Sequence, residues 1–215
     1  MMVFNFLTSH IQPKDMKELI ISPNYSFEWL IKKIENEIDF AKKNLPSGIW
    51  IKCNAIVDSK LIEKLYEASN AGVKINLFVR GICCLKPNVK GLSENIIVKS
   101  IIGRFLEHGR IYVFANGGEF QSIKNDVYIS SADMMPRNLY TRVEAYVPLK
   151  NETVRSQILT QVIPALINDT KNSWLLEQTG EYVKLEDKLN FCSHSYFMEN
   201  PSLSGQGTLS KFKST

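Results

Sequence analysis

The stretch GIWIKCNAIVDSKLIEKLYEASNAGVKINLFV, residues 48–79, decides the fold. Residues 48–54 alternate between apolar and polar side chains well enough to predict a strand. A helix follows, which Asp58 or Ser59 can cap at its start and Gly72 can end in a left-handed conformation. Residues 73–79 again predict a strand. A strand, a helix and a second strand at this spacing form a right-handed β-α-β unit, so the sequence predicts an α/β domain.

The segments on both sides of this stretch extend the same pattern. A helix is predicted over residues 26–44, with Ser26 as its cap and apolar residues at helical spacing. A later helix is predicted from about 153 to 168, where Pro164 should kink or end it. The remaining strand-like runs are residues 19–21, 96–102, 108–114, 127–131, 143–147 and 182–183. The predicted fold is a mixed, largely parallel sheet flanked by helices.

Composition limits the class of protein. The chain has 215 residues, of which 44% are hydrophobic and 22% charged, as is typical of one soluble globular domain. Its net charge of +4 permits an anionic ligand, and no nucleic-acid partner is expected. No apolar run reaches the roughly 20 residues of a membrane span. The cysteines lack metal-ligand spacing, so a cytoplasmic protein with reduced thiols is expected.

Basic side chains in the middle of the chain indicate a phosphate site. Arg80 follows the strand 73–79, at the edge of the sheet where functional loops gather in α/β proteins. His108, the only histidine in the middle of the chain, lies between Arg104 and Arg110. Guanidinium groups bind phosphate oxygens through paired N–H groups, and an imidazole can accept, donate or carry a phosphoryl group.

The residues after the next strand should reach the same place. His108 and Arg110 lie two positions apart at a strand start, so both side chains should share one face. If the returning strand 127–131 pairs beside them, the residues near its end come close, namely Ser130, Ser131, Asp133 and Asn138. The pattern is similar to a degenerate His-x-Lys half-motif of the phospholipase D superfamily, with Arg110 in place of the lysine.

Several longer motifs carry a more specific resemblance. They are LYEAS (65–69), AGVKI (71–75), VRGICCL (79–85), GLSENI (91–96), GRFLEH (103–108) and SADMMPRNL (131–139). Together they resemble the C-terminal region of the bacterial long-form polyphosphate kinases, over about residues 1–185. The resemblance implies reversible transfer of the ATP γ-phosphate to polyphosphate, through a phosphohistidine and with Mg²⁺. It also implies two phospholipase-D-like domains, each giving one histidine to a shared site.

The resemblance assigns roles to individual residues. The arginine of VRGICC is Arg80 and the histidine of FLEH is His108, and both contact nucleotide phosphates in the family. Arg110 and Arg137 are further phosphate-binding candidates from their charge and position, and His108 is the catalytic candidate. The family's phosphate-accepting histidine and its magnesium-associated arginines belong to the preceding domain, so no metal ligand is expected here.

Three segments and two alternative functions follow. Residues 1–23 are expected to be the tail end of a preceding domain, 24–190 the polyphosphate kinase C-terminal domain, and 191–215 a flexible tail. The chain would supply half of a site for ATP and polyphosphate, completed by an upstream kinase fragment or by a homo-oligomer. The alternative is a non-catalytic phosphate- or polyphosphate-binding remnant of a split or truncated gene. A phosphodiesterase is disfavoured, because Arg110 replaces the lysine and only one half-motif is present.

Overall fold

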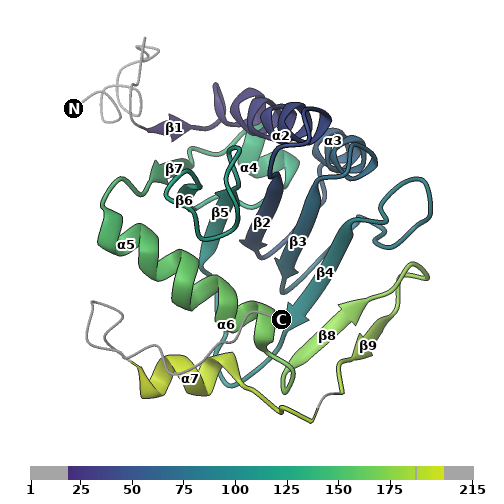
Figure 1. Ribbon diagram of the computed structural model, residues 1–215, viewed down its shortest axis with the longest axis vertical. Helices are drawn as coiled ribbons and strands as arrows, with labels where there is room; N and C mark the ends of the chain where they lie inside the picture. Colours follow the sequence, from purple (N-terminus) through teal and green to yellow (C-terminus); the bar gives the residue numbers. More distant parts are fainter. Residues whose placement is uncertain (1–18, 187, 201–215) are drawn as a thin grey trace.

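The computed structural model describes residues 19–186 and 188–200 (Figure 1). Residues 1–18 of the expected tail end of a preceding domain (1–23) and residues 201–215 of the expected C-terminal tail lie outside this part. The elements are β1 (Ile20–Ile21), α2 (Ser26–Lys42), β2 (Gly48–Cys53), α3 (Ser59–Asn70), β3 (Lys74–Val79), β4 (Ile96–Ile101), β5 (Arg110–Phe114), β6 (Asp126–Ser130), α4 (Pro136–Tyr140), β7 (Ala145–Pro148), α5 (Glu152–Gln157), η1 (Ile158–Val162), α6 (Ile163–Asn168), β8 (Ser173–Leu176), β9 (Tyr182–Lys184) and α7 (Ser193–Glu199).

The strands of the described residues form one nine-stranded sheet in the order β1-β7-β6-β5-β2-β3-β4-β8-β9. Its centre is the predicted β-α-β unit, in which β2 and β3 pair in parallel and β4 adds in parallel to β3. All other neighbouring strands in it are antiparallel. The α/β class and the mixed sheet flanked by helices are confirmed. The sheet is not largely parallel as expected, because among the described strands only β2–β3 and β3–β4 pair in parallel. Neighbours such as β5–β6 and β8–β9 follow one another without a crossover helix and therefore run antiparallel.

The central strands direct alternate side chains into two apolar layers. Ile49 and Ile51 of β2 pack in the layer with α2 and α3, whereas Trp50 packs in the layer with η1 and α6. Likewise, Tyr112 and Val113 of β5 enter opposite layers. Figure 1 shows α2 and α3 on one side of the sheet and the helix running from α5 to α6 on the other. The two layers fix the central strands, whose ends carry the candidate site.

Helix α3 begins and ends as its sequence predicts. The carboxylate of Asp58 accepts a hydrogen bond from the backbone N–H of Leu61 (3.0 Å), and Gly72 adopts a left-handed φ of +95°. The predicted capping role of Ser26 in α2 is wrong, because the N-cap is Tyr25 and makes no side-chain cap bond. Ser26 is instead buried, and its hydroxyl accepts a hydrogen bond from the Ser22 hydroxyl at 2.6 Å.

Replacing Asp58 with alanine is expected to lower the free energy of unfolding by about 1 kcal/mol, the usual value of an N-cap. Urea unfolding at neutral pH measures the loss. The matched control is Ser59→Ala, since Ser59 is the exposed neighbour that the sequence offered as an alternative cap. Its effect should stay within about 0.5 kcal/mol. Equal losses in the two variants would contradict the assignment of the cap to Asp58.

The helix predicted over residues 153–168 continues through Pro164 instead of ending there. A π-helical turn, η1, precedes the proline, and the N–H of Ile163 bonds to the carbonyl of Ile158. Proline lacks an N–H and its ring collides with the carbonyl one α-helical turn earlier. The wider π turn accommodates this ring, so α5, η1 and α6 form one helical rod against the sheet.

The end of the chain differs most from the sequence-based expectation. The predicted strand at 182–183 is part of β9. The strand β8 was not predicted, and it lies between β4 and β9 in the sheet. Helix α7 lies where a flexible tail was expected from residue 191. The buried Asp169 carboxylate accepts hydrogen bonds from the N–H (2.7 Å) and hydroxyl (2.6 Å) of Ser193, which fix the start of α7. Among the described residues, each helix is too short or too polar to cross a membrane.

Candidate functional site

Four strand ends meet at one edge of the sheet. The parallel strands β2 and β3 end side by side, and Asn54 and Arg80 directly follow them. The antiparallel strand β5 begins at the same edge with Arg110, which pairs with Ser130 at the end of β6. Asp133 follows β6 by three residues and reaches back to bond the N–H of Asn54 at 2.7 Å. Strand topology therefore gathers residues that are far apart in the sequence.

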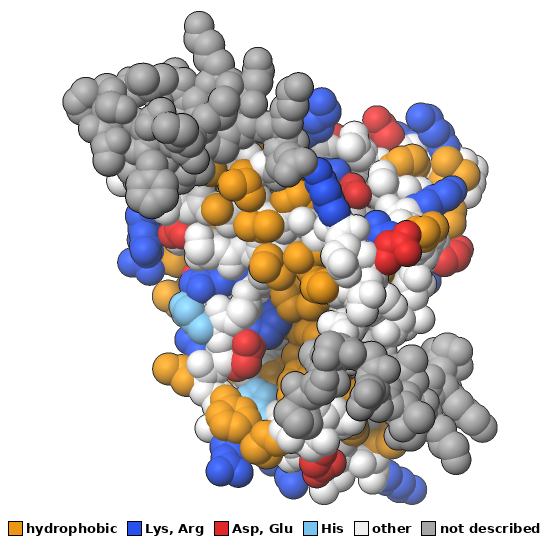
Figure 2. Space-filling view, turned by 90° about the vertical axis from the view of Figure 1, so that its left-hand side faces the viewer, with side chains coloured by type: hydrophobic (Ala, Val, Ile, Leu, Met, Phe, Trp, Pro, Cys, Tyr) orange, Lys and Arg blue, Asp and Glu red, His pale blue; other side chains and the backbone are white. Residues whose placement is uncertain are grey.

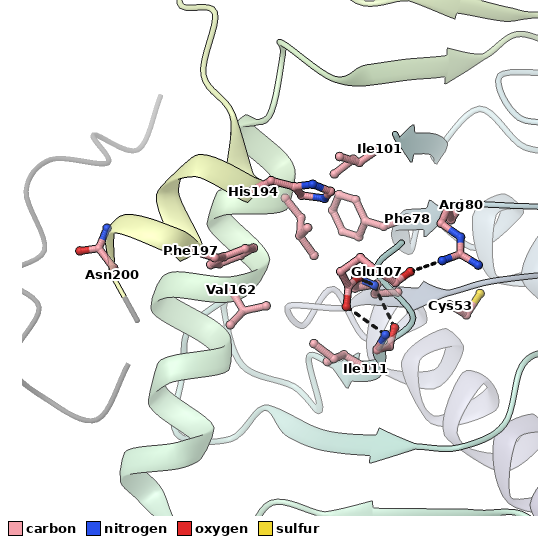
Figure 3. Close-up of a pocket in the computed structure, with 13 residues that line it drawn as sticks. Cys53, Phe78, Arg80, Ile101, Glu107, Ile111, Val162, His194, Phe197 and Asn200 are labelled. Atoms are coloured by element: carbon pink, nitrogen blue, oxygen red, sulfur yellow. Dashed lines mark hydrogen bonds and ion pairs between the residues drawn. The ribbon is translucent and has the colours of Figure 1, made fainter. Parts of the chain in front are cut away.

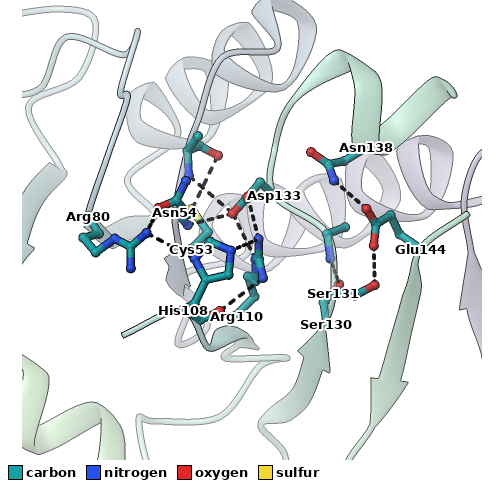
Figure 4. A network of polar contacts seen from close by, with 12 residues as sticks. Cys53, Asn54, Arg80, His108, Arg110, Ser130, Ser131, Asp133, Asn138 and Glu144 are labelled. Atoms are coloured by element: carbon teal, nitrogen blue, oxygen red, sulfur yellow. Dashed lines mark hydrogen bonds and ion pairs between the residues drawn. The ribbon is translucent and has the colours of Figure 1, made fainter. Parts of the chain in front are cut away.

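His108 lies between two guanidinium groups at this edge (Figure 4). Its Nδ1 is 3.2 Å from Nη2 of Arg80, and its Nε2 is 2.8 Å from Nη2 of Arg110. Arg80 is held in place by the side-chain carbonyl of Asn54 (2.7 Å) and the backbone carbonyl of Glu107 (2.7 Å). The imidazole itself is exposed to solvent. A ligand from outside can therefore reach the basic cluster of Arg80, His108 and Arg110 at its exposed member, His108, while the two arginines are partly buried beside it.

Asp133 fixes the second arginine. Its two carboxylate oxygens accept hydrogen bonds from Nε (3.2 Å) and Nη2 (2.9 Å) of Arg110, and the backbone N–H groups of Asn54 and Ala55 also donate to it. Burial by itself would raise the pKa of Asp133, but the hydrogen bond from Arg110 and those from the backbone outweigh it and lower the pKa. The carboxylate therefore stays charged and locks the guanidinium plane of Arg110.

A second ion pair fixes the loop that carries His108. Lys52 of β2 pairs with Glu107, and its ammonium also donates to the carbonyl of Gly109 at 2.9 Å. The N–H of Gly109 donates to Glu107 Oε1 at 3.0 Å. Burial opposes ionisation of Glu107, yet the hydrogen bond and charge of Lys52 outweigh it and lower the pKa of the carboxyl. The residues on both sides of His108 are thus bonded to the strand edge.

The surroundings of His108 favour its neutral form. Partial desolvation, followed by the positive charges of Arg110 and Arg80, lowers the pKa of the imidazole. A neutral imidazole has one acceptor nitrogen, whereas guanidinium groups only donate. Both close contacts of His108 therefore cannot be hydrogen bonds at once, and one sets an N–H against another N–H. The two guanidinium groups and the imidazole N–H are all donors, so anionic oxygens bound at this edge would give them acceptors, and the cluster has the chemistry of an anion site.

Not every predicted candidate joins the cluster. Ser130 donates to the carbonyl of Ala145 (2.9 Å), and Asn138 donates to Glu144 (2.6 Å). Across the described residues, no hydrogen bond or ion pair links the side chain of Arg137 to Arg80, His108 or Arg110. Arg137 instead lies exposed on the short helix α4.

Two further predicted candidates turn elsewhere. The Ser131 hydroxyl donates to Glu144 Oε2 at 2.5 Å. Arg104 lies against the ring of Phe105, 5.7 Å from its centroid, and beside Met198. Among the described contacts, Arg104 pairs with neither Glu94 nor Glu107, the two carboxylates closest to it in the sequence.

Sequence reasoning missed Asn54 and Lys52. The position of Asn54 carried a usable signal, because it follows β2 at the edge where Arg80 follows β3. Lys52 lies within β2, where the alternation of side chains predicts which face of the sheet a residue occupies but not which partner it contacts. Its partner Glu107 belongs to a loop, and no periodic pattern places a loop side chain.

The cysteines near the site are poor nucleophiles. Cys53 and Cys83 are free thiols, and burial raises the pKa of both. The pKa of Cys83 rises to about 11, and that of Cys53 rises further. A thiol must ionise to attack, so neither is a candidate for covalent catalysis.

A pocket of about 270 Å³ opens beside the cluster (Figure 3). Arg80, Lys52 and Glu107 form its polar side, while apolar residues of the sheet, η1, α6 and α7 form the rest. Its apolar residues are Phe78, Ile101, Ile111, Val162, Leu166 and Phe197. Figure 2 shows a band of hydrophobic side chains down one face of the molecule, with basic side chains and histidines beside it. The anion site therefore borders an apolar surface.

Magnesium does not fit the residues at this site. Within the described part of the chain, no group of three histidine, cysteine, aspartate or glutamate side chains could hold a metal ion. The two nearby carboxylates are already engaged, Asp133 by Arg110 and Glu107 by Lys52.

Comparison with known proteins identifies the family. Residues 19–193 match the family model described as polyphosphate kinase C-terminal domain 2. The chain is 50% identical over 206 residues to the polyphosphate kinase of Erythrobacter litoralis, covering 95% of this chain and 29% of that protein. It is 44% identical over 182 residues to the polyphosphate kinase of Synechocystis, covering 85% of this chain and 24% of that protein.

A solved structure of the same family agrees. The crystal structure of polyphosphate kinase from Porphyromonas gingivalis has a TM-score of 0.86 and 32% identity, covering 93% of this chain and 30% of that chain. A phospholipase D family member, Nuc from Salmonella typhimurium, has a TM-score of only 0.45, which is too low to support an inference. The chain spans less than a third of the length of the relatives described above. It belongs to the polyphosphate kinase family and corresponds to the C-terminal domain 2 of that family.

Proposed function

We propose that this chain supplies one wall of the active site of an ATP:polyphosphate phosphotransferase, which transfers the ATP γ-phosphate to polyphosphate and back. The observation that carries the proposal is the position of His108, with one ring nitrogen 3.2 Å from Arg80 and the other 2.8 Å from Arg110. Three groups with more donors than acceptors converge at a solvent-exposed edge. Membership of the polyphosphate kinase family supports phosphate oxygens as the anion that they bind.

In this proposal each basic residue has a distinct task. Arg80 and Arg110 donate N–H groups to phosphate oxygens and compensate the charge that develops during transfer. Asn54 and Asp133 hold the two guanidinium groups in orientation, which reduces the reorganisation needed when phosphate binds. His108, neutral in the free site, accepts or returns a proton at a phosphate oxygen. Arg137 lies on α4, so in this proposal it binds phosphate only when the polyphosphate is long enough to extend from the cluster to that helix.

The remaining parts of the reaction are assigned elsewhere. The phosphate-accepting histidine and the magnesium-associated residues belong, by family resemblance, to a preceding domain that an upstream segment or a partner fragment would supply. Exposed apolar side chains on the loop beside His108, Leu106 (85% exposed) and Ile102 (60%), support a contact surface at this edge. ATP or ADP and polyphosphate are the proposed substrates, and magnesium would arrive with the nucleotide.

Arg80→Ala and His108→Ala are expected to weaken the binding of ATP and of tripolyphosphate roughly 10- to 100-fold. The first variant loses a charge-assisted hydrogen bond to phosphate, and the second loses the imidazole between the two guanidinium groups. Isothermal titration calorimetry at constant ionic strength measures the affinities. The matched control is Arg155→Ala, which removes the same charge on α5, away from the cluster. The proposal would be overturned if the wild type binds neither ligand, or if Arg155→Ala loses as much ligand affinity as Arg80→Ala.

Incubation with γ-labelled ATP and Mg²⁺ separates the enzymatic function from its alternative. Acid-labile labelling of the chain by itself, if it is lost in His108→Ala, would make His108 the phosphate acceptor and support the enzymatic function. Labelling only after addition of a preceding-domain fragment would support the proposed shared site. Specific binding without labelling under either condition would favour the phosphate-binding remnant and contradict the phosphotransferase.

A further inference from the structure

The loop that carries His108 is held at both ends by other elements. It spans residues 102–109, between β4 and β5. The half next to β5 is bonded to the strand edge through Glu107, whose carboxylate pairs with Lys52 and whose carbonyl accepts from Arg80 at 2.7 Å. The half next to β4 contacts the C-terminal part of the chain instead. The position of His108 therefore depends on two independent sets of contacts.

The contact on the β4 side is made by His194 of α7. Its Nδ1 accepts a hydrogen bond from the backbone N–H of Phe105 at 3.3 Å, and the two rings lie 5.6 Å apart. Gly103 makes this approach possible, since a Cβ atom at that position would lie 2.5 Å from Nδ1 of His194. His194 is only 4% exposed, although it belongs to a segment whose sequence has no periodic apolar pattern. Figure 3 shows its ring directed toward the pocket beside Arg80 and Glu107.

The N-terminus of helix α7, which carries His194, is held in place by hydrogen bonds. The first residue of the helix, Ser193, donates its N–H and its hydroxyl to the buried Asp169 carboxylate. The same carboxylate accepts from the N–H of Asn172 (3.0 Å), whose backbone carbonyl accepts from the N–H of Ile102 (2.9 Å). The start of the loop and the start of α7 are thus joined through one corner of the fold. A helix fixed in this way holds His194 at a constant distance from the loop.

We propose that His194 is a positioning residue of the phosphate site, which acts through the 102–109 loop to keep His108 between Arg80 and Arg110. Without the acceptor at Nδ1, the N–H of Phe105 loses its partner and the loop gains freedom at its β4 side. His108 then moves away from the two guanidinium groups. The consequence for phosphate binding rests on the function proposed above, but the position of His108 in the free protein does not.

The titration of His108, followed by NMR of the ring signals, tests this proposal without any ligand. Partial desolvation, followed by the positive charges of Arg110 and Arg80, lowers the pKa of His108, with Asp133 opposing this shift and Lys52 adding to it. Movement of His108 out of this place would weaken both effects. In His194→Phe, which keeps a ring but no acceptor, the pKa of His108 is expected to rise toward the unperturbed value of about 6.5. Gly103→Ala, which displaces His194, should give the same shift. His194→Asn, whose side-chain oxygen can accept from Phe105, should restore the wild-type titration.

Controls separate positioning from loss of structure. Phe197→Leu alters the same helix and the same pocket without a bond to the loop, and should leave the titration of His108 unchanged. Circular dichroism confirms that each variant is folded, and His108→Gln assigns the His108 signals. If His194→Phe does not fold, Gly103→Ala decides the question by itself. A wild-type titration in a folded His194→Phe or Gly103→Ala variant overturns the proposal.

Tripolyphosphate binding by the same variants distinguishes this proposal from the proposed function. His194→Phe is expected to weaken binding roughly three- to tenfold, the value of one neutral hydrogen bond, and His194→Asn should restore it. If His108 shifts as expected but the wild type binds no tripolyphosphate, His194 still positions His108 and the proposed function fails. If the wild type binds and His108 does not shift, the positioning role fails and the proposed function stands.

Discussion

Replacing Asp133 with alanine is expected to lower the free energy of unfolding by about 3–5 kcal/mol, the usual cost of removing one partner from a buried ion pair. The Asp133 side chain is 4% exposed and that of Arg110 14%, so the remaining guanidinium would stay largely buried without its counter-charge. The backbone N–H groups of Asn54 and Ala55 would lose their acceptor as well. Urea unfolding at pH 7 measures the loss.

The matched control is another aspartate paired with a cation at a more accessible place. Asp126 pairs with Lys33 at 2.5 Å, but the two side chains are 31% and 20% exposed. Asp126→Ala should therefore cost no more than about 1 kcal/mol. If Asp133→Ala and Asp126→Ala cost the same, burial does not decide the value of the Asp133–Arg110 pair.

The pH dependence gives a second test of the same pair. The folded-state pKa of Asp133 is depressed by Arg110 and by backbone hydrogen bonds, which outweigh burial. Its stabilising contribution is therefore fully present above the unfolded-state pKa of about 3.9 and is lost as the pH falls through the folded-state pKa. The stability difference between wild type and Asp133→Asn should shrink in that acidic range. If the difference in unfolding free energy between the two proteins stays constant from pH 7 down to the pH of acid unfolding, Asp133 is not ionised in the folded protein.

Asp169→Ala is expected to be the second severe substitution, with a loss of at least about 3 kcal/mol, because several buried donors lose one acceptor. The carboxylate is fully buried and accepts four hydrogen bonds, from the N–H of Asn172, the hydroxyl of Ser173, and both the N–H and hydroxyl of Ser193. It also helps to balance Lys99, whose pKa burial lowers to about 8. Helix α7 should detach first.

Hydrogen–deuterium exchange resolves this local effect from global unfolding. In Asp169→Ala the amides of α7 should exchange much faster than those of β2 and β3, because the first residue of α7 bonds to Asp169 whereas β2 and β3 make no bond to it. The control is Asp39→Ala, an exposed aspartate of α2, which should change stability by less than about 0.5 kcal/mol. Unchanged protection of α7 in Asp169→Ala would show that another contact fixes the helix.

The sequence by itself determined the centre of the fold. Apolar periodicity, the cap at Asp58 and the stop at Gly72 specify β2, α3 and β3, because these signals act over a few neighbouring residues. The rule that loops after parallel strands carry function placed Arg80 at the correct edge. The motifs that contain Arg80 and His108 were sufficient to indicate the family, since each is a contiguous run of residues.

Only the tertiary structure decided what surrounds these residues. The contacts of His108 with Arg80 and of Asp133 with Asn54 join segments that no local pattern relates, whereas the approach of His108 to Arg110 follows from their spacing of two residues. Helix α7 shows the same limit, because the N–H of its first residue bonds to the buried carboxylate of Asp169, which lies in a separate segment of the chain. Local propensity cannot predict such an element, since its stability comes from long-range hydrogen bonds and burial and not from its own sequence.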